Sequence, residues 1–505
     1  MKYGTIATGS QESLDTAKYI LKNNGNAFDA AIAAVFTSMT SEFALTGAGG
    51  GGTLLGINNG QSPIIYDFFV DCPKITNKKN NFQKIQVDFG DTQQNFYAGE
   101  GSVAIPGTIM GLIQAHKDNG KLPLNIILEP AIDCAKNGIY LSEYQVFINS
   151  LVKPILTLTN EGKKLFNNEN GFLKEGDLFS NSEFADFLLQ LGKDGSDFFY
   201  RGDCAELIDK HFSEYGYITK NNLENYKVIK RKPLSFQINE HTVFTNPAPA
   251  FGGNLIKFLF EILKRSDALN ADESSLIKAM MITSLARQDN CKDPNNDKEI
   301  DNLLHEEIIN KYIHYYNNED KISDLYPLSG FGSTTHTSVL DKDNNAVSIT
   351  TTNGEGSGYF IPECGIMMNN MLGEEDLNPF GFHQWNTIRR LPTMISPTII
   401  TSTNNIDYVL GSGGSNRIRS ANIQVILNVL IKKLSLKDAI NNPRMHLEGN
   451  TLFYEPGVNI PNKKYLKNII LNPFKNKSLF FGGVNTVSSN DAIGDPRRGG
   501  VGEVY

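Results

Sequence analysis

Two neighbouring strand patterns, at residues 335–340 and 346–352, restrict the fold of this chain more than any other feature. Both are rich in threonine, valine and isoleucine, whose β-branched side chains favour strands. The polar residues between them, 341–345, are turn formers, so the two patterns together predict a β-hairpin. Further strand patterns lie at residues 62–70, 398–402 and 407–410. The chain is therefore expected to form β-sheet from segments that are far apart in sequence.

Helical patterns dominate much of the rest. Residues 11–23 place Leu14, Ala17, Ile20 and Leu21 on one face, while residues 27–39 are apolar nearly all round and are expected to be buried. Further helices are expected at residues 108–115 and 254–263, within a middle region, 121–266, that is mostly helical. Residues 289–330 are rich in Asn, Asp, Glu, Lys and Tyr, and we expect this segment to be exposed and partly mobile.

Composition narrows the class of protein. The 505 residues suffice for one large or two ordinary domains, and 40% hydrophobic with 20% charged residues are typical of a globular protein. A net charge of −8 gives no reason to expect nucleic acid or an anionic membrane as a partner. No signal peptide or run of ~18 apolar residues is seen, so a cytoplasmic location is expected.

Neither metal nor nucleotide is expected as a cofactor. The five cysteines and eight histidines show no metal-ligand spacing. The glycine run at residues 47–52 is not followed by Gly-Lys-Ser/Thr, so it favours close backbone packing or access to a pocket over phosphate binding.

Six threonines crowd between residues 332 and 358, and one of them is a candidate nucleophile. A threonine hydroxyl needs a base, and no Ser-His-Asp arrangement or G-x-S-x-G elbow is seen nearby. If the chain is cut before a threonine, the freed α-amine, with a pKa near ~7.7–8, can be that base. Such a residue should begin a strand, follow an exposed linker and face amides that hold an oxyanion. Thr334 meets the first two conditions, and Gly413-Gly414-Ser415 can supply the third, but the pattern alone does not separate Thr334 from Thr335.

The sequence here resembles the small-subunit start of the gamma-glutamyltransferase (gamma-glutamyl transpeptidase) family, which are self-cleaving N-terminal-nucleophile hydrolases. The matching motifs occur in family order along nearly the whole chain. They are Gly25-Asn26-Ala27 with Asp29-Ala30-Ala31, Gly49-Gly50-Gly51-Gly52, Ile105-Pro106-Gly107, Thr334-Thr335-His336 with Asp341-Lys342-Asp343, Gly365-Ile366 with Asn369-Asn370, and Gly494-Asp495-Pro496-Arg497.

This resemblance implies roles for individual residues. It selects Thr334 as the nucleophile, freed by cleavage between Ser333 and Thr334, and Thr352 as the second threonine that supports it. The remaining implied site residues are Gly413, Gly414 or Ser415 for the oxyanion amides, Asn353, Glu374 and Glu375 for the substrate, and Thr393 in place of the first serine of a family serine pair. His336 is expected to be a packed strand residue, Arg497 and Arg498 to form ion pairs, and Thr335 and Thr337 to face the opposite side or solvent.

The resemblance also implies a fold and an activity. The expected fold is a four-layer αββα sandwich in which fragments 1–333 and 334–505 share one domain as a heterodimer that can oligomerise further. The expected reaction passes the acyl group of a gamma-glutamyl amide such as glutathione through a Thr334 acyl-enzyme to water or an amine. Two alternatives remain open: an amidohydrolase of the same fold with another acyl substrate, and an unprocessed, catalytically silent scaffold.

One departure from the family bears on the substrate. The family holds the donor's α-carboxylate with the arginine of a D-F/Y-R-E-x-x-P element, and here Phe69 stands in that place, between Asp67-Phe68 and Val70-Asp71. A phenyl ring cannot replace a bidentate guanidinium. Either another cation such as Arg417 takes over, or the donor has no α-carboxylate at that end.

Overall fold

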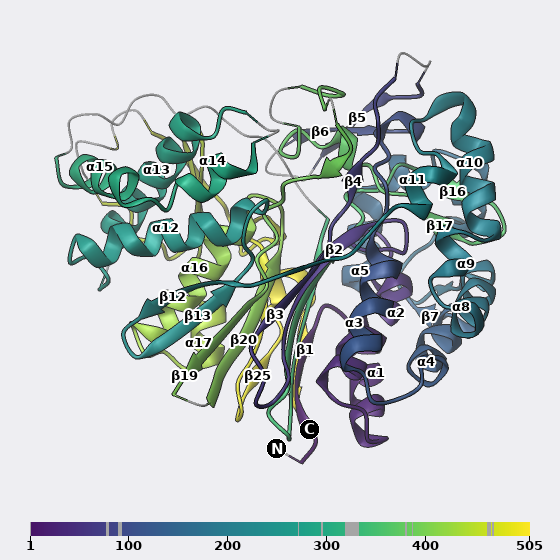
Figure 1. Ribbon diagram of the computed structural model, residues 1–505, viewed down its shortest axis with the longest axis horizontal. Coiled ribbons are helices and arrows are strands. Elements are labelled where there is room, and N and C mark those ends of the chain that lie inside the picture. The colour runs from purple at the N-terminus through teal and green to yellow at the C-terminus, as the bar shows by residue number, and fades with distance from the viewer. Residues whose placement is uncertain are drawn as a thin grey trace.

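The computed structural model describes residues 2–505 except 77–79, 89–92, 271, 294–295, 319–332, 379–380, 386, 404, 462–465 and 467–468. Two stacked sheets form the centre, and helices lie against the outer face of each sheet (Figure 1). This arrangement of helix, sheet, sheet and helix is the four-layer αββα sandwich expected from the sequence. The last part of the polar segment and Gly332 fall outside the described residues.

The first sheet has seven strands within the described chain, in the order β11-β3-β2-β15-β14-β1-β26. Their bounds are Ile229–Arg231 (β11), Ile64–Phe68 (β3), Gly51–Ile57 (β2), Ala346–Thr352 (β15), Thr335–Asp341 (β14), Gly4–Thr8 (β1) and Val501–Val504 (β26). The predicted hairpin is confirmed as β14 and β15, which pair antiparallel with Thr335 opposite Thr351. Because β1 and β2 flank this hairpin, the threonines lie at the middle of the sheet.

The second sheet has six described strands in the order β12-β13-β19-β20-β24-β25. Their bounds are Leu234–Ile238 (β12), His241–Thr245 (β13), Thr398–Ser402 (β19), Asn405–Gly413 (β20), Gly483–Val487 (β24) and Ala492–Ile493 (β25). An apolar layer that includes Leu55 and Leu340 of the first sheet and Val409 and Val487 of the second fills the space between them. The end of β20 is thereby held beside the start of β14.

One group of helices lies on the outer side of the first sheet and shares one apolar core with it. It comprises α1 (Gln11–Lys22), α2 (Ala27–Ser41), α3 (Thr108–Asn119), α4 (Leu124–Asn137), α8 (Ser182–Asp194) and α10 (Asp203–Tyr215). Of these, α1, α2 and α3 contact the strands directly, whereas α4 packs on α2 and α8 packs on α4. The predicted all-apolar helix is confirmed as α2, in which every side chain is buried. Asn26 caps it: its side chain accepts a hydrogen bond from the Asp29 amide, and the Asp29 carboxylate accepts one from the Asn26 amide, which satisfies the free N–H groups there.

A second group covers the other sheet. It comprises α12 (Phe251–Arg265), α13 (Glu273–Asn290), α14 (Asp297–Asn302), α15 (Glu306–Asn317), α16 (Arg417–Leu430) and α17 (Leu436–Asn441). Two of these helices lie in the segment that we expected to be exposed and partly mobile. Many side chains of residues 297–317 are exposed, as expected, but the segment forms helices that are docked on the protein. In α15, Ile309, Tyr312 and Tyr316 recur at helical spacing and are buried, so few apolar residues are enough to dock a mostly polar helix.

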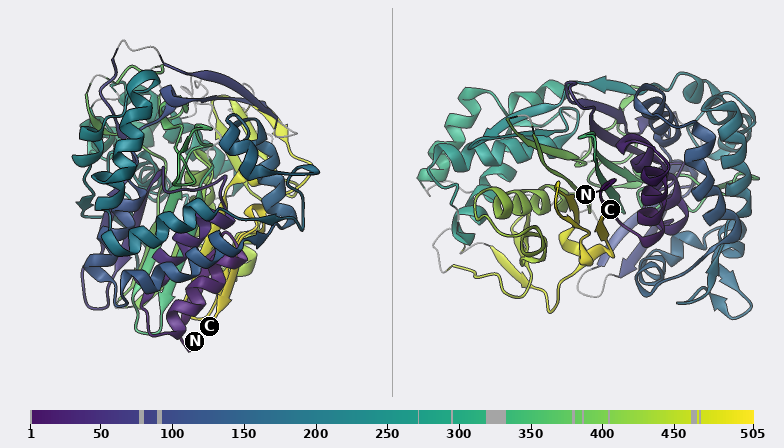
Figure 2. Two further views of the ribbon diagram at one scale, coloured as in Figure 1. Left: turned by 90° about the vertical axis from the view of Figure 1, so that its right-hand side faces the viewer. Right: turned by 90° about the horizontal axis from the view of Figure 1, so that it is seen from below.

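Both sheets combine strands from before and after residue 333. The chain ends also meet, because β1 and β26 are neighbours and the Lys2 amide donates to the Tyr505 carbonyl at 2.9 Å. The two views of Figure 2 show the N and C labels side by side at one end of the sheets. Neither segment forms a separate lobe.

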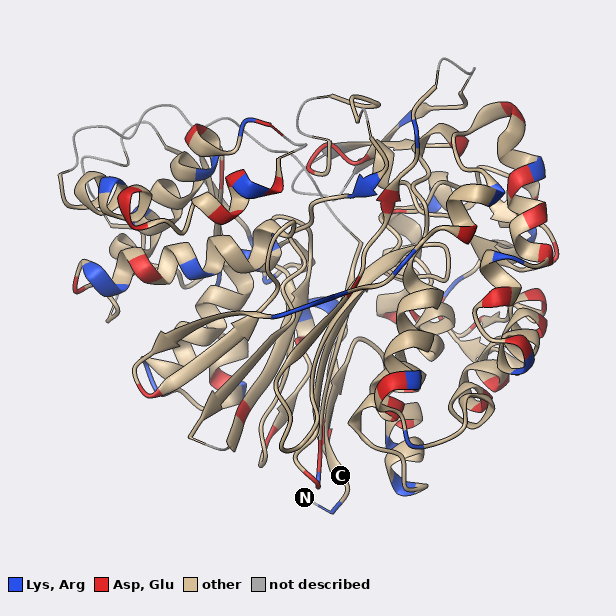
Figure 3. Cartoon of the chain, viewed as in Figure 1, with Lys and Arg blue, Asp and Glu red and all other residues tan. Residues whose placement is uncertain are grey.

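Charged residues lie mainly on the outer helices and loops, and acidic and basic side chains are interspersed over most of the view in Figure 3. None of the described helices combines the length and apolar character that crossing a bilayer requires. Nor do the described residues include a cluster of three or more side chains suited to hold a metal ion.

Candidate active site

Thr334 lies immediately before β14, and its side chain is only 3% exposed. The peptide bond that precedes it is held on its carbonyl side by Thr352, the last residue of β15, whose hydroxyl donates a hydrogen bond to the Ser333 carbonyl oxygen. The Gly354 amide in turn donates to Thr352 Oγ1 at 3.0 Å, which orients the hydroxyl. A hydroxyl donor on a carbonyl polarises it toward attack, so Thr352 is placed to act on the bond before Thr334.

Glu355 also contacts this segment, although no sequence motif predicted a role for it. Its Oε1 accepts a hydrogen bond from the Ser333 amide at 3.2 Å, and its Oε2 accepts a weaker one from Asn370 Nδ2 at 3.4 Å. Burial, with a smaller contribution from Asp376, raises the pKa of Glu355 to about 8. The available signal was a glutamate between two glycines directly after the hairpin.

The glycine-rich turn after β20 lies against Thr334. A Cβ at Gly413 would come within 2.1 Å of the Thr334 carbonyl oxygen, so only glycine fits there. Gly414 has φ +120, a backbone conformation that other residues rarely adopt. Ser415 follows, and its hydroxyl donates to the Asp376 carboxylate. The predicted oxyanion turn therefore adjoins the predicted nucleophile.

Arg498 reaches the same place from the chain's C-terminal segment. Its Nη1 donates to the Thr334 carbonyl at 3.2 Å and its Nε to the Leu479 carbonyl at 3.3 Å. The expectation of a terminal ion pair is therefore wrong for Arg498, because its turn packs against β24 and directs the guanidinium to backbone carbonyls. Arg497 does form the expected ion pair, with both of its contacts to Glu455 within 2.7 Å.

A small cavity of about 20 Å³ opens beside Thr334. Five predicted site residues line it: Thr334, Thr352, Glu374, Thr393 and Ser415. The wall is completed by Asp376 and by the apolar side chains of Phe69, Leu377, Met394, Ile395 and Ile418. The lining that the structure describes thus contains two carboxylates and no basic residue.

The two other predicted substrate residues lie elsewhere. Asn353 is buried, donates to the Met367 carbonyl at 3.1 Å, and lines a separate cavity with Met39 and Phe43. Glu375 is partly exposed and does not line the cavity beside Thr334. Glu374, rather than Glu375, is therefore the carboxylate that faces Thr334.

Two acidic side chains, Glu374 and Asp376, line this cavity, and a third, Glu355, is buried close enough to repel them. Burial, followed by repulsion from Glu355 and Asp376, raises the pKa of Glu374 well above its ordinary value. Burial also raises the pKa of Asp376, although the hydrogen bond from Ser415 and the charge of Arg417 oppose the change. A bound cation would relieve this repulsion.

Phe69 lines the cavity and is 2% exposed. The acidic residues on either side of it, Asp67 and Asp71, do not line the cavity and form ion pairs with an arginine. Arg390 binds both of them, with Nη1 2.8 Å from Asp67 Oδ1 and Nε 2.7 Å from Asp71 Oδ1. Arg417, the candidate substitute cation, is buried at the start of α16 with its guanidinium 5.0 Å from the centre of the Phe480 ring. Neither arginine is part of the cavity wall.

The other residues of the threonine motif face away from the cavity. His336 is enclosed between Thr350 Oγ1, at 2.7 Å from Nδ1, and Ser338 Oγ, at 2.9 Å from Nε2. Burial lowers the pKa of His336 to about 3, so it is neutral and packed, as expected. Thr335 and Thr337 are both buried, so they do not reach solvent, and the Thr335 hydroxyl donates to Glu42.

Comparison with known proteins gives consistent matches along the chain. A family model described as gamma-glutamyltranspeptidase matches residues 14–505. The glutathione hydrolase proenzyme of Pseudomonas aeruginosa is 30% identical over 90% of this chain and 85% of its own length. The capsule biosynthesis protein CapD proenzyme of Bacillus anthracis is 27% identical over 99% of this chain and 90% of its own length. Among solved structures, a cephalosporin acylase from Bacillus halodurans shares the fold, with a TM-score of 0.84 over 100% of this chain and 96% of that chain at 22% identity.

Proposed function

Since this chain belongs to the gamma-glutamyltranspeptidase family and is a gamma-glutamyltransferase-like hydrolase, we propose that it cuts itself before Thr334 and then uses Thr334 to take an acyl group from a small amide. The observation that carries this proposal is the hydrogen bond from the Thr352 hydroxyl to the carbonyl of the bond to be cut. The relatives named above are called proenzymes, which agrees with processing.

Self-cleavage begins when Thr334 Oγ attacks the Ser333 carbonyl carbon. The Thr352 hydroxyl stabilises the negative charge that develops on the carbonyl oxygen, while Glu355 holds the Ser333 amide. The C–N bond then breaks, the threonine nitrogen takes up a proton, and the peptide has become an ester. Water hydrolyses the ester, which leaves the carboxylate of Ser333 and a free amine on Thr334.

Turnover uses the same groups on a substrate amide. The Thr334 amine accepts the proton of its own hydroxyl as Oγ attacks the substrate carbonyl, and it returns the proton to the leaving amine. Backbone amides of the turn Gly413-Gly414-Ser415, which adjoins Thr334, hold the oxyanion. The acyl-enzyme passes its acyl group to water or to an acceptor amine, so no metal is required.

The donor is proposed to carry an ammonium group and no α-carboxylate. Glu374 and Asp376 offer two carboxylates to a ligand cation, whereas the family's arginine position presents the ring of Phe69. A carboxylate buried against that ring without a partner would cost on the order of several kcal/mol. A 4-aminobutyryl amide fits this wall better than a gamma-glutamyl amide.

Steady-state kinetics on two anilides tests the donor. We expect 4-aminobutyryl-p-nitroanilide to have a higher kcat/KM than gamma-glutamyl-p-nitroanilide, and Phe69→Arg to shift the preference toward the gamma-glutamyl compound. Phe69→Leu serves as the apolar control and should keep the wild-type preference. Strong wild-type preference for the gamma-glutamyl anilide would restore the ordinary donor of relatives named glutathione hydrolase.

A denaturing gel separates this proposal from a silent scaffold. Processed protein gives fragments of 333 and 505 − 333 = 172 residues. Protein that remains one band and hydrolyses no amide would refute it.

A further inference from the structure

Two of the five cysteines lie with their sulfur atoms in contact. Cys204 Sγ and Cys364 Sγ are 3.1 Å apart, and the side chains are 0% and 4% exposed. Cys204 is the second residue of α10, and Cys364 lies in the turn between β16 (Phe360–Ile361) and β17 (Ile366–Met367). Within the described chain, no other pair of cysteines is in contact.

Both cysteines are held on fixed backbone. The side chain of Asn181, the residue that caps α8, donates to the Gly365 carbonyl at 2.8 Å and accepts from the Phe184 amide at 3.1 Å, which ties the turn of Cys364 to that helix. Cys204 is fixed by the first turn of α10. A disulfide requires the two sulfurs at about 2.05 Å, so closing the present contact needs a shift of only about 1 Å.

We propose that Cys204 and Cys364 are a disulfide cross-link site that joins the segment before residue 333 to the segment after it. The bond itself can form in the intact chain. Its role as a tether between two fragments rests on the proposed self-cleavage, because cleavage before Thr334 leaves Cys204 in one fragment and Cys364 in the other.

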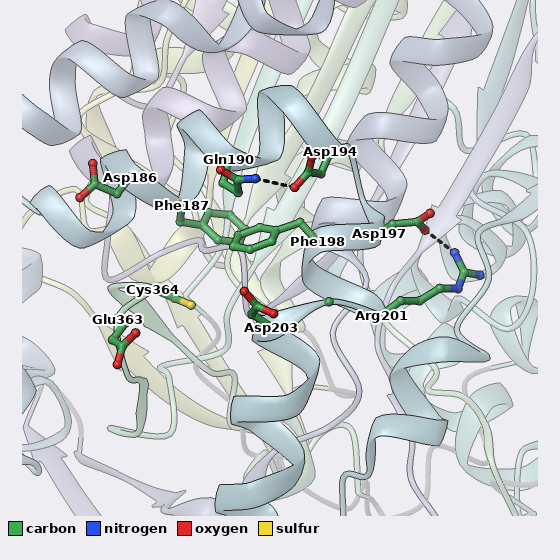
Figure 4. Close-up of a pocket in the computed structure, with 11 residues that line it drawn as sticks. Asp186, Phe187, Gln190, Asp194, Asp197, Phe198, Arg201, Asp203, Glu363 and Cys364 are labelled. Carbon is green, nitrogen blue, oxygen red and sulfur yellow. Dashed lines mark hydrogen bonds and ion pairs between the residues drawn. The ribbon is translucent and has the colours of Figure 1, made fainter.

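A cavity gives an oxidant access to one of the two sulfurs. Cys364 lines a cavity of about 740 Å³ between α8, α9 (Asp197–Tyr200) and the start of α10, whereas Cys204 does not (Figure 4). Cys364 is therefore the thiol that meets a reagent first, and Cys204, behind it, is the thiol that resolves the first product.

The cavity wall is acidic. Five carboxylic residues line it, namely Asp186, Asp194, Asp197, Asp203 and Glu363, and the guanidinium of Arg201 on the same wall is paired with Asp197 (Figure 4). A negative wall attracts cations and repels anions. Cationic small disulfides should therefore react with Cys364 faster than anionic ones.

The chemistry is an exchange with a low-molecular-weight disulfide as the oxidant. Cys364 loses its proton and attacks one sulfur of the reagent, which releases one small thiolate and leaves a mixed disulfide on Cys364. Cys204 then loses its proton, attacks the Cys364 sulfur and releases the second small thiol. The reagent is reduced to two thiols and the two cysteines are oxidised to one disulfide.

The resting pair is protected from adventitious oxidation. The contact with Cys364, followed by burial, raises the pKa of the Cys204 thiol far above its ordinary value. Once Cys364 is modified, that contact is lost and Cys204 ionises more readily. The pair therefore stays reduced in a reducing compartment and closes where small disulfides are supplied.

Thiol counting with mass mapping tests the cross-link in both the wild type and the uncleaved Thr334→Ala chain. After treatment with cystamine, a dicationic disulfide, and removal of excess reagent, we expect the denatured protein to show three free thiols in place of five. The proteolytic map should contain a peptide that joins Cys204 to Cys364. Five free thiols, or a cross-link between other cysteines, would overturn the proposal. If the Cys204–Cys364 peptide is also found in Thr334→Ala, formation of the cross-link does not depend on self-cleavage.

The tether is tested on the processed enzyme. On a denaturing gel without reductant, the cystamine-treated protein should run as one band of about 56 kDa, and reductant should release the two fragments. Cys364→Ser should give two bands in both lanes, and Cys134→Ser, a matched control that is partly buried elsewhere, should behave as the wild type. Two non-reduced bands from cross-linked wild type would refute the tether.

The direction of the electrostatic effect is a further test. At low ionic strength, cross-linking by cystamine should be at least about 10-fold faster than by oxidised glutathione, which is anionic, and the ratio should shrink in 0.5 M NaCl, where the Debye length is only a few ångströms. Equal rates for the two reagents, or a faster reaction with oxidised glutathione, would show that the reagent does not reach Cys364 through the acidic cavity.

Discussion

Two clusters of buried charge in this molecule have opposite electrostatic balances. Near the C-terminus, Arg444 Nη2 lies 2.6 Å from Asp495 Oδ2, and Arg497 contacts Glu455 and Asp495. Although burial alone would raise the pKa of Asp495, the two arginines hold it below its ordinary value. Beside Thr334, Glu355 and Glu374 are equally buried, and their pKa values lie well above the ordinary value of a glutamate.

The pKa values of the two clusters differ because of the charged residues beside each carboxyl group, and not because of the depth of burial. The C-terminal cluster has a cation for each carboxylate, so it is complete without any ligand. In the cluster at the cavity, Glu355, Glu374 and Asp376, the charge of Arg417 only partly offsets burial and mutual repulsion, so a proton or a ligand cation can supply further counter-charge. The first cluster should therefore matter for stability and the second for binding and chemistry, and substitutions can separate the two.

The largest effect should come from the nucleophile. Thr334→Ala should remain a single 505-residue chain and lose at least about 10⁴-fold in amide turnover, because both the nucleophile and the freed amine are removed. Its unfolding free energy should not fall. A denaturing gel and a rate assay measure this, with Thr335→Ser as the control that keeps processing and activity. Processing in Thr334→Ala would place the cleavage elsewhere.

Breaking the C-terminal cluster should lower stability instead. Arg497→Met leaves Glu455 and Asp495 buried with one cation fewer, so we expect urea unfolding of the uncleaved Thr334→Ala background to lose about 3–5 kcal/mol. Arg201→Met removes an exposed ion pair with Asp197 and should cost no more than about 1 kcal/mol. A similar small loss in both variants would show that the C-terminal cluster adds little to stability.

Neutralising one carboxylate at the cavity should affect the substrate more than the fold. Glu374→Gln replaces a buried carboxyl that repels its acidic neighbours when ionised, so stability should stay the same or rise. KM for the 4-aminobutyryl anilide should increase roughly 10- to 150-fold, as for a lost charged hydrogen bond of about 1.5–3 kcal/mol. Glu375→Gln, one residue away and outside the cavity, is the control. If Glu375→Gln carried the larger KM effect, Glu375 would be the binding carboxylate.

The smallest effect, taken per pH unit, is a difference in how the stability of the two clusters depends on pH. Because the pKa of Glu355 is raised in the folded protein to about 8, the folded state binds the proton more tightly, and stability should fall as pH rises from 4.5 to 8. The slope from one such group is at most about 1.4 kcal/mol per pH unit. Asp495, whose pKa is lowered, should cost stability only as pH falls below 3.8. Urea unfolding of Thr334→Ala and of its Glu355→Gln derivative, between pH 4.5 and 8 and again below pH 3.8, measures both changes in stability. The Glu355→Gln derivative should reduce the slope only between pH 4.5 and 8.

The sequence predicted the fold and the family because their signals are local and ordered along the chain. The strand period of residues 335–352 and the apolar helix at 27–39 both depend on neighbours in sequence, and both are confirmed. The motifs identified the family and selected site residues, of which Thr334, Thr352, Glu374, Thr393 and Ser415 line one cavity in the structure. The chemical roles of these residues stay predictions.

What the sequence did not predict depends on contacts between distant segments. Arg498 was expected in an ion pair and instead binds the Thr334 carbonyl, 164 positions away. Glu355 had no partner in the sequence pattern, because its contact with Ser333 exists only once the hairpin has closed. The helix at residues 306–317 was missed because its three buried side chains are few among polar ones.

The meeting of the chain ends has a consequence for engineering. Because the Lys2 amide is hydrogen-bonded to the Tyr505 carbonyl, a short linker can join residue 505 to residue 2. The gene can then be opened so that the encoded chain starts, after the initiator methionine, at Thr334 and finishes at Ser333. Such a circular permutant would follow the same path through both sheets, since only the external connection changes. Once its initiator methionine is removed, it would carry a free threonine amine without any self-processing, so catalysis could be studied separately from maturation.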